Sequence, residues 1–99
     1  MVKERHRAAE ITVERRHDGE YHVLVIEGGT RTTHTVSVDD DYYRKLTDGS
    51  IPREELVRRS FEFLLAREPK ESILGTFDLP VIARYFSEYE REMRRQFGA

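Results

Sequence analysis

An Asp-Gly pair, Asp18-Gly19, lies between two runs in which apolar and polar residues alternate, and it restricts the fold more than any other feature. Alternation with a period of two is typical of a strand that buries one face. Asp-Gly is a preferred pair for the two-residue type I′ turn, in which both residues have positive φ. The sequence therefore predicts a β-hairpin made of residues 11–16 and 21–26.

The turn also predicts which side chains share a face. An uninterrupted ladder on both sides of it places Val13 opposite Leu24 and Ile11 opposite Ile26, and we expect this face to be the core face. The other face of the second strand then carries three apolar residues, Tyr21, Val23 and Val25.

A third strand is predicted over residues 32–38, after the Gly28-Gly29 pair. A two-residue loop at the glycines turns Val36 and Val38 away from the predicted core face, whereas a three-residue loop returns them to it. Because the second arrangement buries more apolar surface on one side, we expect the three-residue loop.

The rest of the chain has helical periodicity with start and stop signals. The expected helices span about residues 40–47, 52–67, 69–74 and 79–96. The acidic run Asp39-Asp40-Asp41 suits the capping of the first helix, and a cation site is the alternative interpretation. Strands followed by helices predict an α+β fold, with a three-stranded antiparallel meander over about residues 10–38 and three or four helices on one of its faces.

Length and composition indicate one folded domain, residues 10–97, after a flexible lead-in of residues 1–9. Acidic and basic residues nearly balance, with a formal net charge of −2, which is not the pattern of a basic nucleic-acid-binding domain. The sequence has no cysteine, no apolar run long enough to span a membrane and no apolar stretch after its first charged residues. We therefore expect a cytoplasmic protein without disulfides.

One segment resembles a known pattern. It consists of Glu71-Ser-Ile-Leu74, Phe77-Asp-Leu79, Ile82, Tyr85-Phe86 and Glu88-Tyr89. This run resembles a signature of small prokaryotic proteins without an assigned activity, and the similarity covers about residues 52–89. The resemblance implies a folded helical unit and supplies no activity, cofactor or ligand. Many of those proteins have proline where this chain has Ser87, so the resemblance leaves open whether the last helix continues past that position.

Candidate catalytic and metal-binding residues are few. The sequence contains no nucleophile motif, phosphate-binding loop or zinc-protease motif, so we expect neither an enzyme nor a cofactor. His22 and His34 are predicted on neighbouring strands, opposite each other, where two imidazoles could hold Zn²⁺ together with a carboxylate. A metal-dependent enzyme that uses this pair is therefore a weaker alternative function. The simpler interpretation is a polar row of Arg15, His22 and His34 at one end of the core.

Nucleic-acid binding is an alternative function. Residues 69–74, the turn at residues 75–77 and the helix from Asp78 resemble the outline of a helix-turn-helix. Its second helix offers four arginines, Arg84, Arg91, Arg94 and Arg95. Interleaved glutamates keep this segment near neutral, and the residues at its start are apolar or acidic, so a core helix is the preferred interpretation.

Protein interaction is the function that the sequence favours. The predicted outward face of Tyr21, Val23 and Val25 has no evident cover, although the last helix or the N-terminal segment is an alternative cover. A continuous last helix of about 30 Å also overhangs the sheet, so that Met93 and Phe97 extend its apolar stripe. We therefore expect a small interaction module that binds a second copy of itself, as a homodimer, or another protein.

Overall fold

The computed structural model describes residues 9–17 and 19–98. The α+β fold is confirmed, with one sheet and one core. The strands are β1 (Glu10–His17), β2 (Glu20–Glu27), β3 (Thr30–Ser37) and β4 (Thr76–Asp78). The helices are α1 (Asp40–Thr47), α2 (Arg53–Leu65), the 3₁₀ helix η1 (Lys70–Ser72), α3 (Val81–Tyr85) and α4 (Tyr89–Phe97). The predicted lead-in lies outside the described residues except for Ala9, which packs partly against the core.

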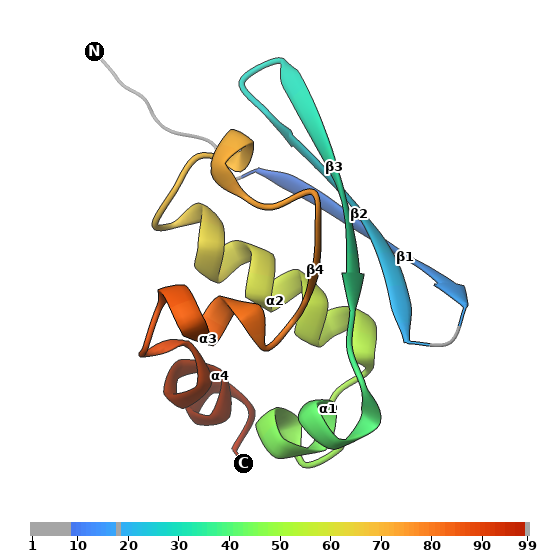
Figure 1. Cartoon of the computed structure of the whole chain (residues 1–99), viewed down its shortest axis with the longest axis vertical. Helices are drawn as coiled ribbons and strands as arrows, with labels where there is room; N and C mark the ends of the chain where they lie inside the picture. Colours follow the sequence, from blue (N-terminus) through green and yellow to red (C-terminus); the bar gives the residue numbers. More distant parts are fainter. Residues whose placement is uncertain (1–8, 18, 99) are drawn as a thin grey trace.

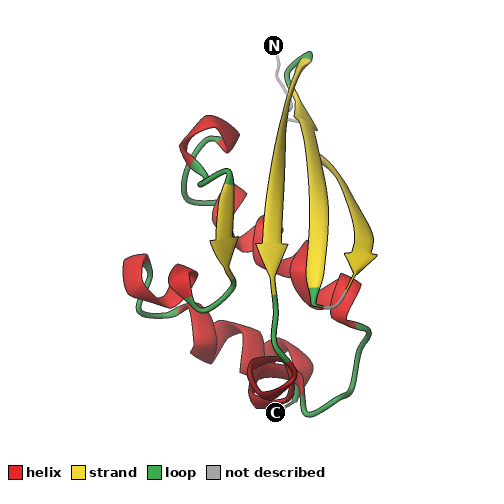
Figure 2. Cartoon of the chain, turned by 45° about the vertical axis from the view of Figure 1, so that its right-hand side comes forward, coloured by secondary structure: helices red, strands yellow, loops and turns green. Residues whose placement is uncertain are grey.

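The sheet has the order β1-β2-β3-β4 and is covered by helices on one face (Figure 1). Strands β1 to β3 are antiparallel, and β4 lies parallel to β3 at the edge. Helix α2 crosses behind the strands, with α1 and α4 beside one end of the sheet (Figure 2). Within the described residues, no helix has the length and apolar character needed to cross a membrane.

The predicted register of the first hairpin is wrong by one residue. His17 pairs with Glu20, as expected, and Asp18 of the predicted turn lies outside the described residues. The next pair is Arg15 with Tyr21, so Arg16 is an extra residue in β1 and forms a bulge. This bulge exchanges the two faces of β2 relative to β1, and Val13 pairs with Val23 instead of Leu24.

The core face of β2 therefore consists of Tyr21, Val23 and Val25, which are at most 1% exposed. Leu24 and Ile26, expected in the core, lie on the outer face and are only half-buried. Burial explains the choice between the two registers, because a tyrosine and two valines remove more apolar surface from water here than the two residues that face outward.

The second loop also differs from the prediction. Glu27 pairs with Thr30, so the loop contains only Gly28 and Gly29. Their φ values of 65° and 82° are those of a type I′ turn, which glycine adopts without steric cost. Val36, on β3, is buried as predicted, but it lies opposite Tyr21 on the exchanged core face.

Strand β4 was not predicted, and the sheet has four strands instead of three. The expected helix over residues 69–74 is reduced to the single 3₁₀ turn η1. Asp78, expected at the start of the last helix, belongs to β4 and accepts a hydrogen bond from the Ser37 hydroxyl on β3. The chain thus returns to the sheet before its last helices begin.

The first two helices agree well with the prediction. Helix α1 has the predicted bounds, and Asp39 is its N-cap, with its carboxylate accepting from the Tyr42 N–H at 2.7 Å. Capping is thus the observed role of the first aspartate of the acidic run. Helix α2 buries a broad apolar stripe that includes Leu56 and Phe61, both fully buried.

The last helix is broken, contrary to the prediction of one helix over residues 79–96. Helix α3 ends at Tyr85, the next residue, Phe86, is extended with φ −133° and ψ 98°, and α4 begins at Tyr89. The break lets two aromatic rings pack on Phe63, with ring centroids 5.9 Å away for Phe86 and 5.3 Å away for Tyr89. No overhanging helix remains, because α4 is short and packs on α1 and α2.

Candidate functional site

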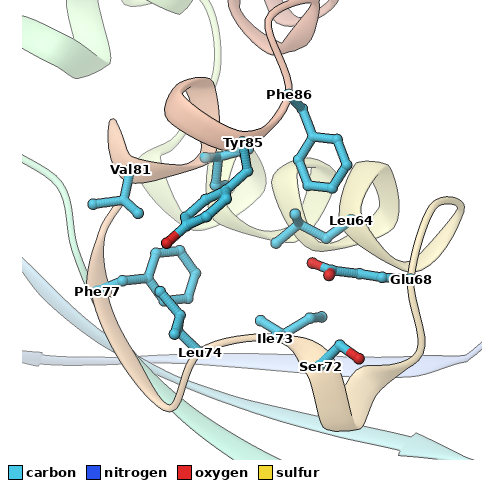
Figure 3. Close-up of a pocket in the computed structure, with 10 residues that line it drawn as sticks. Leu64, Glu68, Ser72, Ile73, Leu74, Phe77, Val81, Tyr85 and Phe86 are labelled. Carbon is cyan, nitrogen blue, oxygen red and sulfur yellow. The ribbon is translucent and has the colours of Figure 1, made fainter.

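An apolar groove lies beside β4. Its floor includes Leu64 from α2, Ile73 after η1 and Phe77 from β4 (Figure 3). Ile82 from α3 also lines it, and all four side chains are at most 8% exposed. The cavity has a volume of about 210 Å³ and opens to solvent. Four separate elements contribute to it, so its shape depends on the tertiary fold.

Two large apolar side chains at the mouth of the groove are exposed. Leu74 is 47% and Tyr85 is 70% exposed, and these are the exposed large hydrophobic residues of the described chain. Tyr85 extends from α3 over the groove, and Leu74 approaches from the opposite wall (Figure 3). Val81 and Phe86 complete the mouth and are half-buried. Both exposed large hydrophobic residues of the described part of the chain therefore lie at the mouth of this groove.

The wall that carries Leu74 is fixed to the sheet by two buried polar side chains. The His34 ring lies 2.8 Å from the Leu74 carbonyl through Nδ1 and 2.8 Å from the Thr32 hydroxyl through Nε2. Because a carbonyl only accepts, Nδ1 donates to the Leu74 carbonyl, and Nε2 forms the second hydrogen bond with the Thr32 hydroxyl. Lys70, only 5% exposed, reaches Thr30 at 2.6 Å and so attaches η1 to the start of β3.

The opposite wall is held where α3 and α4 meet. The Arg67 guanidinium lies 3.5 Å from the Phe63 ring centroid and 3.1 Å from the Glu88 carboxylate. The pKa of Glu88 is lowered, first by its own backbone N–H and then by Arg67. These contacts tie the end of α2 to the joint that follows Phe86. Contacts outside the groove therefore hold both of its walls in place.

Two polar side chains, Glu68 and Ser72, interrupt the apolar lining. The Glu68 carboxylate lies between Leu64 and Ile73 and is directed into the groove (Figure 3). A carboxylate at the edge of an apolar cavity favours an occupant that combines an apolar group with a positive charge or a hydrogen-bond donor.

The residues that were predicted as a contact surface are mostly in the core. Tyr21, Val23, Val25 and Met93 are at most 1% exposed, so the prediction that they face a partner is wrong in this fold. Phe97 is half-buried beside the Arg59 guanidinium, 5.8 Å from its ring centroid. The cause is the Arg16 bulge for the strand residues and the broken helix for the other two.

The predicted histidine pair does not form. His34 lies opposite Val23 on the core face, whereas His22 lies opposite Thr35 on the outer face. The two imidazoles therefore point to opposite sides of the sheet and cannot share an ion. Among residues 9–17 and 19–98, no three His, Cys, Asp or Glu side chains are grouped as metal ligands would be.

The predicted helix-turn-helix is also absent, because β4 replaces the turn between its two helices. Arg84 lies on α3, and the other three arginines lie on α4, where they line an open depression with Glu90. Arg95 is paired with Glu92, at 2.5 Å. The four arginines thus belong to two different helices, and the charge of Arg95 is balanced by Glu92.

Leu74 and Tyr85 were not among the candidate site residues predicted from the sequence. The signal that identifies them is adjacency, since Ile73-Leu74 and Tyr85-Phe86 are pairs of large apolar neighbours at the ends of short elements. In an extended segment, neighbours point to opposite sides, so one member of the first pair must face outward. In each pair it is the other member, Ile73 or Phe86, that is the more buried.

Comparison of the chain with protein-family models, with curated proteins and with solved structures finds no match. The resemblance of residues 52–89 to small prokaryotic proteins therefore stays a prediction.

Proposed function

We propose that the chain is a small cytoplasmic, non-catalytic interaction module that holds an apolar segment of another protein in the groove. The observation that carries the proposal is the position of Leu74 and Tyr85, the exposed large hydrophobics of the described residues, at the mouth of one groove. Large apolar side chains that cluster on a surface are typical of sites where proteins associate. Tyrosine is also enriched at the centres of such sites.

The size of the groove supports a protein partner over a free small molecule. Pockets for drug-sized ligands usually enclose roughly 300–1,000 Å³, whereas this cavity measures about 210 Å³ and is open on one side. A space of this size suits one bulky side chain with its neighbours resting on Leu74 and Tyr85. Self-association through the sheet, as predicted from the sequence, has lost its basis because Tyr21, Val23 and Val25 are buried.

Selection from a displayed library of random peptides tests the proposal. Peptides that bind the purified protein are synthesised, and their affinities are measured by isothermal titration calorimetry. We expect Tyr85→Ala and Leu74→Ser each to weaken binding about tenfold or more, the loss typical of a central contact residue. Arg84→Ala is the matched control, because Arg84 is the exposed neighbour of Tyr85 and does not line the groove.

Two outcomes contradict the proposal. The first is the failure of the library to yield binders, or binding that both groove variants leave unchanged. The second is concentration-dependent dimerisation in sedimentation velocity that Tyr85→Ala abolishes, which assigns the groove to a second copy of the chain instead of another protein.

A further inference from the structure

The free edge of β4 adjoins the groove and has backbone groups available for pairing. The Gly75 carbonyl accepts from the Thr35 N–H at 2.7 Å, and the Leu79 N–H donates to the Ser37 carbonyl at 2.9 Å. Residues that bond to one neighbouring strand alternate along a parallel strand. The N–H and C=O groups of Thr76 and Asp78, between those contacts, therefore point away from β3, toward the edge that no described strand occupies.

A second depression lies on the other side of this edge. It measures about 440 Å³ and includes side chains from the outer face of the sheet, Glu20, Thr35, Ser37, Thr76 and Asp78. It shares Leu74, Phe77 and Val81 with the apolar groove, so the two depressions flank β4 from opposite faces of the sheet. A strand added to β4 has side chains that point alternately to those two faces.

The two depressions differ in chemistry in a way that specifies the occupant. The groove is apolar apart from Glu68 and Ser72 at its edge. The charged residues of the outer depression are Glu20 and Asp78, and the His17 ring lies 3.1 Å from the Glu20 carboxylate. Every charged side chain that lines either depression is thus acidic. A complementary strand places bulky apolar residues inward and basic residues outward.

We infer that the partner segment is an extended peptide that pairs with the free edge of β4, alternating bulky apolar residues in the groove with lysine or arginine in the outer depression. This inference rests on the proposed function and adds the partner's conformation and charge. Strand addition of this kind takes affinity from backbone hydrogen bonds and specificity from the alternate side chains. The acidic lining favours a basic segment and disfavours an acidic one.

Thr76 offers a direct test, because its N–H points to the free edge and takes no part in pairing with β3. Proline is tolerated on an edge strand where the N–H faces solvent, so Thr76→Pro removes the donor and leaves the sheet intact. Thr76→Val is the matched control that keeps the donor. The probe is an acetylated, amidated peptide in which isoleucine and lysine alternate, with a matched peptide that has glutamate in place of lysine.

We expect the isoleucine–lysine peptide to bind the unaltered protein and Thr76→Val alike, and to bind Thr76→Pro about tenfold or more weakly. Methylation of alternate backbone nitrogens of the peptide produces the same loss without any change to the protein, so the test survives a folding defect in Thr76→Pro. We expect the glutamate peptide to bind the unaltered protein at least tenfold more weakly than the lysine peptide does. Added salt should reduce this difference in affinity.

The inference is overturned if neither designed peptide binds, if Thr76→Pro and the methylated peptides bind as well as their controls, or if the glutamate peptide is preferred. If library peptides in that case still bind in a way that requires Tyr85 and Leu74, the proposed function is retained. Failure of the library and of the designed peptides together overturns both.

Discussion

Exchange of the two faces of β2 makes a sharp prediction about neighbouring residues. Val23 is 1% exposed on the core face, and Leu24 is half-buried on the outer face. Replacing either by threonine introduces the same side chain into the same central strand. The strand preference of the new residue is therefore shared. Leu24→Thr also removes more apolar volume than Val23→Thr, so a smaller loss for Leu24→Thr has to come from the face that receives the hydroxyl.

The cost of Val23→Thr has two parts. Exchange of a buried methyl group for a hydroxyl loses about 0.8 kcal/mol of apolar burial, and a buried hydroxyl without a partner costs about 1–3 kcal/mol. The sum is about 2–4 kcal/mol, a large share of the 5–15 kcal/mol that is typical of a whole domain. Leu24→Thr exposes its hydroxyl to water and should cost less than about 1 kcal/mol.

Urea denaturation followed by circular dichroism measures both variants on one scale. With a slope of about 1–1.5 kcal/mol/M, Val23→Thr should lower the midpoint by about 2 M and Leu24→Thr by less than 1 M. If the β1–β2 ladder had no bulge, Leu24 would face the core, and Leu24→Thr would lower the midpoint more than Val23→Thr. A larger loss for Leu24→Thr than for Val23→Thr would therefore refute both the Arg16 bulge and the assignment of the core face.

Three further predictions concern the joints between helices. The Ser60 and Tyr89 hydroxyls are 2.6 Å apart and buried, so Ser60→Ala should lower the free energy of unfolding by about 1–3 kcal/mol, measured by thermal unfolding. The double variant Ser60→Ala/Tyr89→Phe should lose less stability than the sum of the two single variants, and strict additivity contradicts this. The Tyr42 hydroxyl, first among several causes, lowers the pKa of the Glu90 carboxyl. The resulting stability is complete above the unfolded pKa near 4.3 and is lost as pH falls through the lower folded pKa. The deficit of Glu90→Gln, roughly 1 kcal/mol at pH 7, should therefore shrink as pH falls below about 4.3; a constant deficit contradicts it. Ser87→Pro should leave the melting temperature unchanged or slightly higher, because the extended residue before it suits a proline; a fall of several degrees would show that the break needs the Ser87 N–H.

The elements that the sequence predicts well are those with local signals. Helix α1 has the predicted bounds because its acidic N-terminus and the glycine after it, Gly49, act within a few residues. The meander and the apolar stripe of α2 follow from periodicity over eight or more residues. In these cases the local preference and the tertiary contacts agree.

The register was not predictable in the same way, because both faces of β2 are apolar. Tyr21, Val23 and Val25 alternate with Leu24 and Ile26, so the pattern does not identify which set is buried. The Arg16 bulge decides, and nothing local marks it, since a charged residue near a turn fits a regular strand equally well. The energy that selects it comes from packing of the whole β2 face on the helices.

The groove has an even less local origin, and two departures from prediction create it together. The short strand β4 pairs with β3, where Ser37 and Asp78 are 41 residues apart in the sequence, and this pairing brings Leu74 and Phe77 to the sheet edge. The break before Ser87 ends α3 after five residues, so Tyr85 stays at the surface instead of entering a continuous helix stripe. If residues 79–96 formed one continuous helix, there would be no joint between α3 and α4 for Phe86 and Arg67 to hold. Without β4, the sheet would have no free edge beside the apolar floor of the groove. The features that escaped prediction are thus the ones on which the proposed site depends.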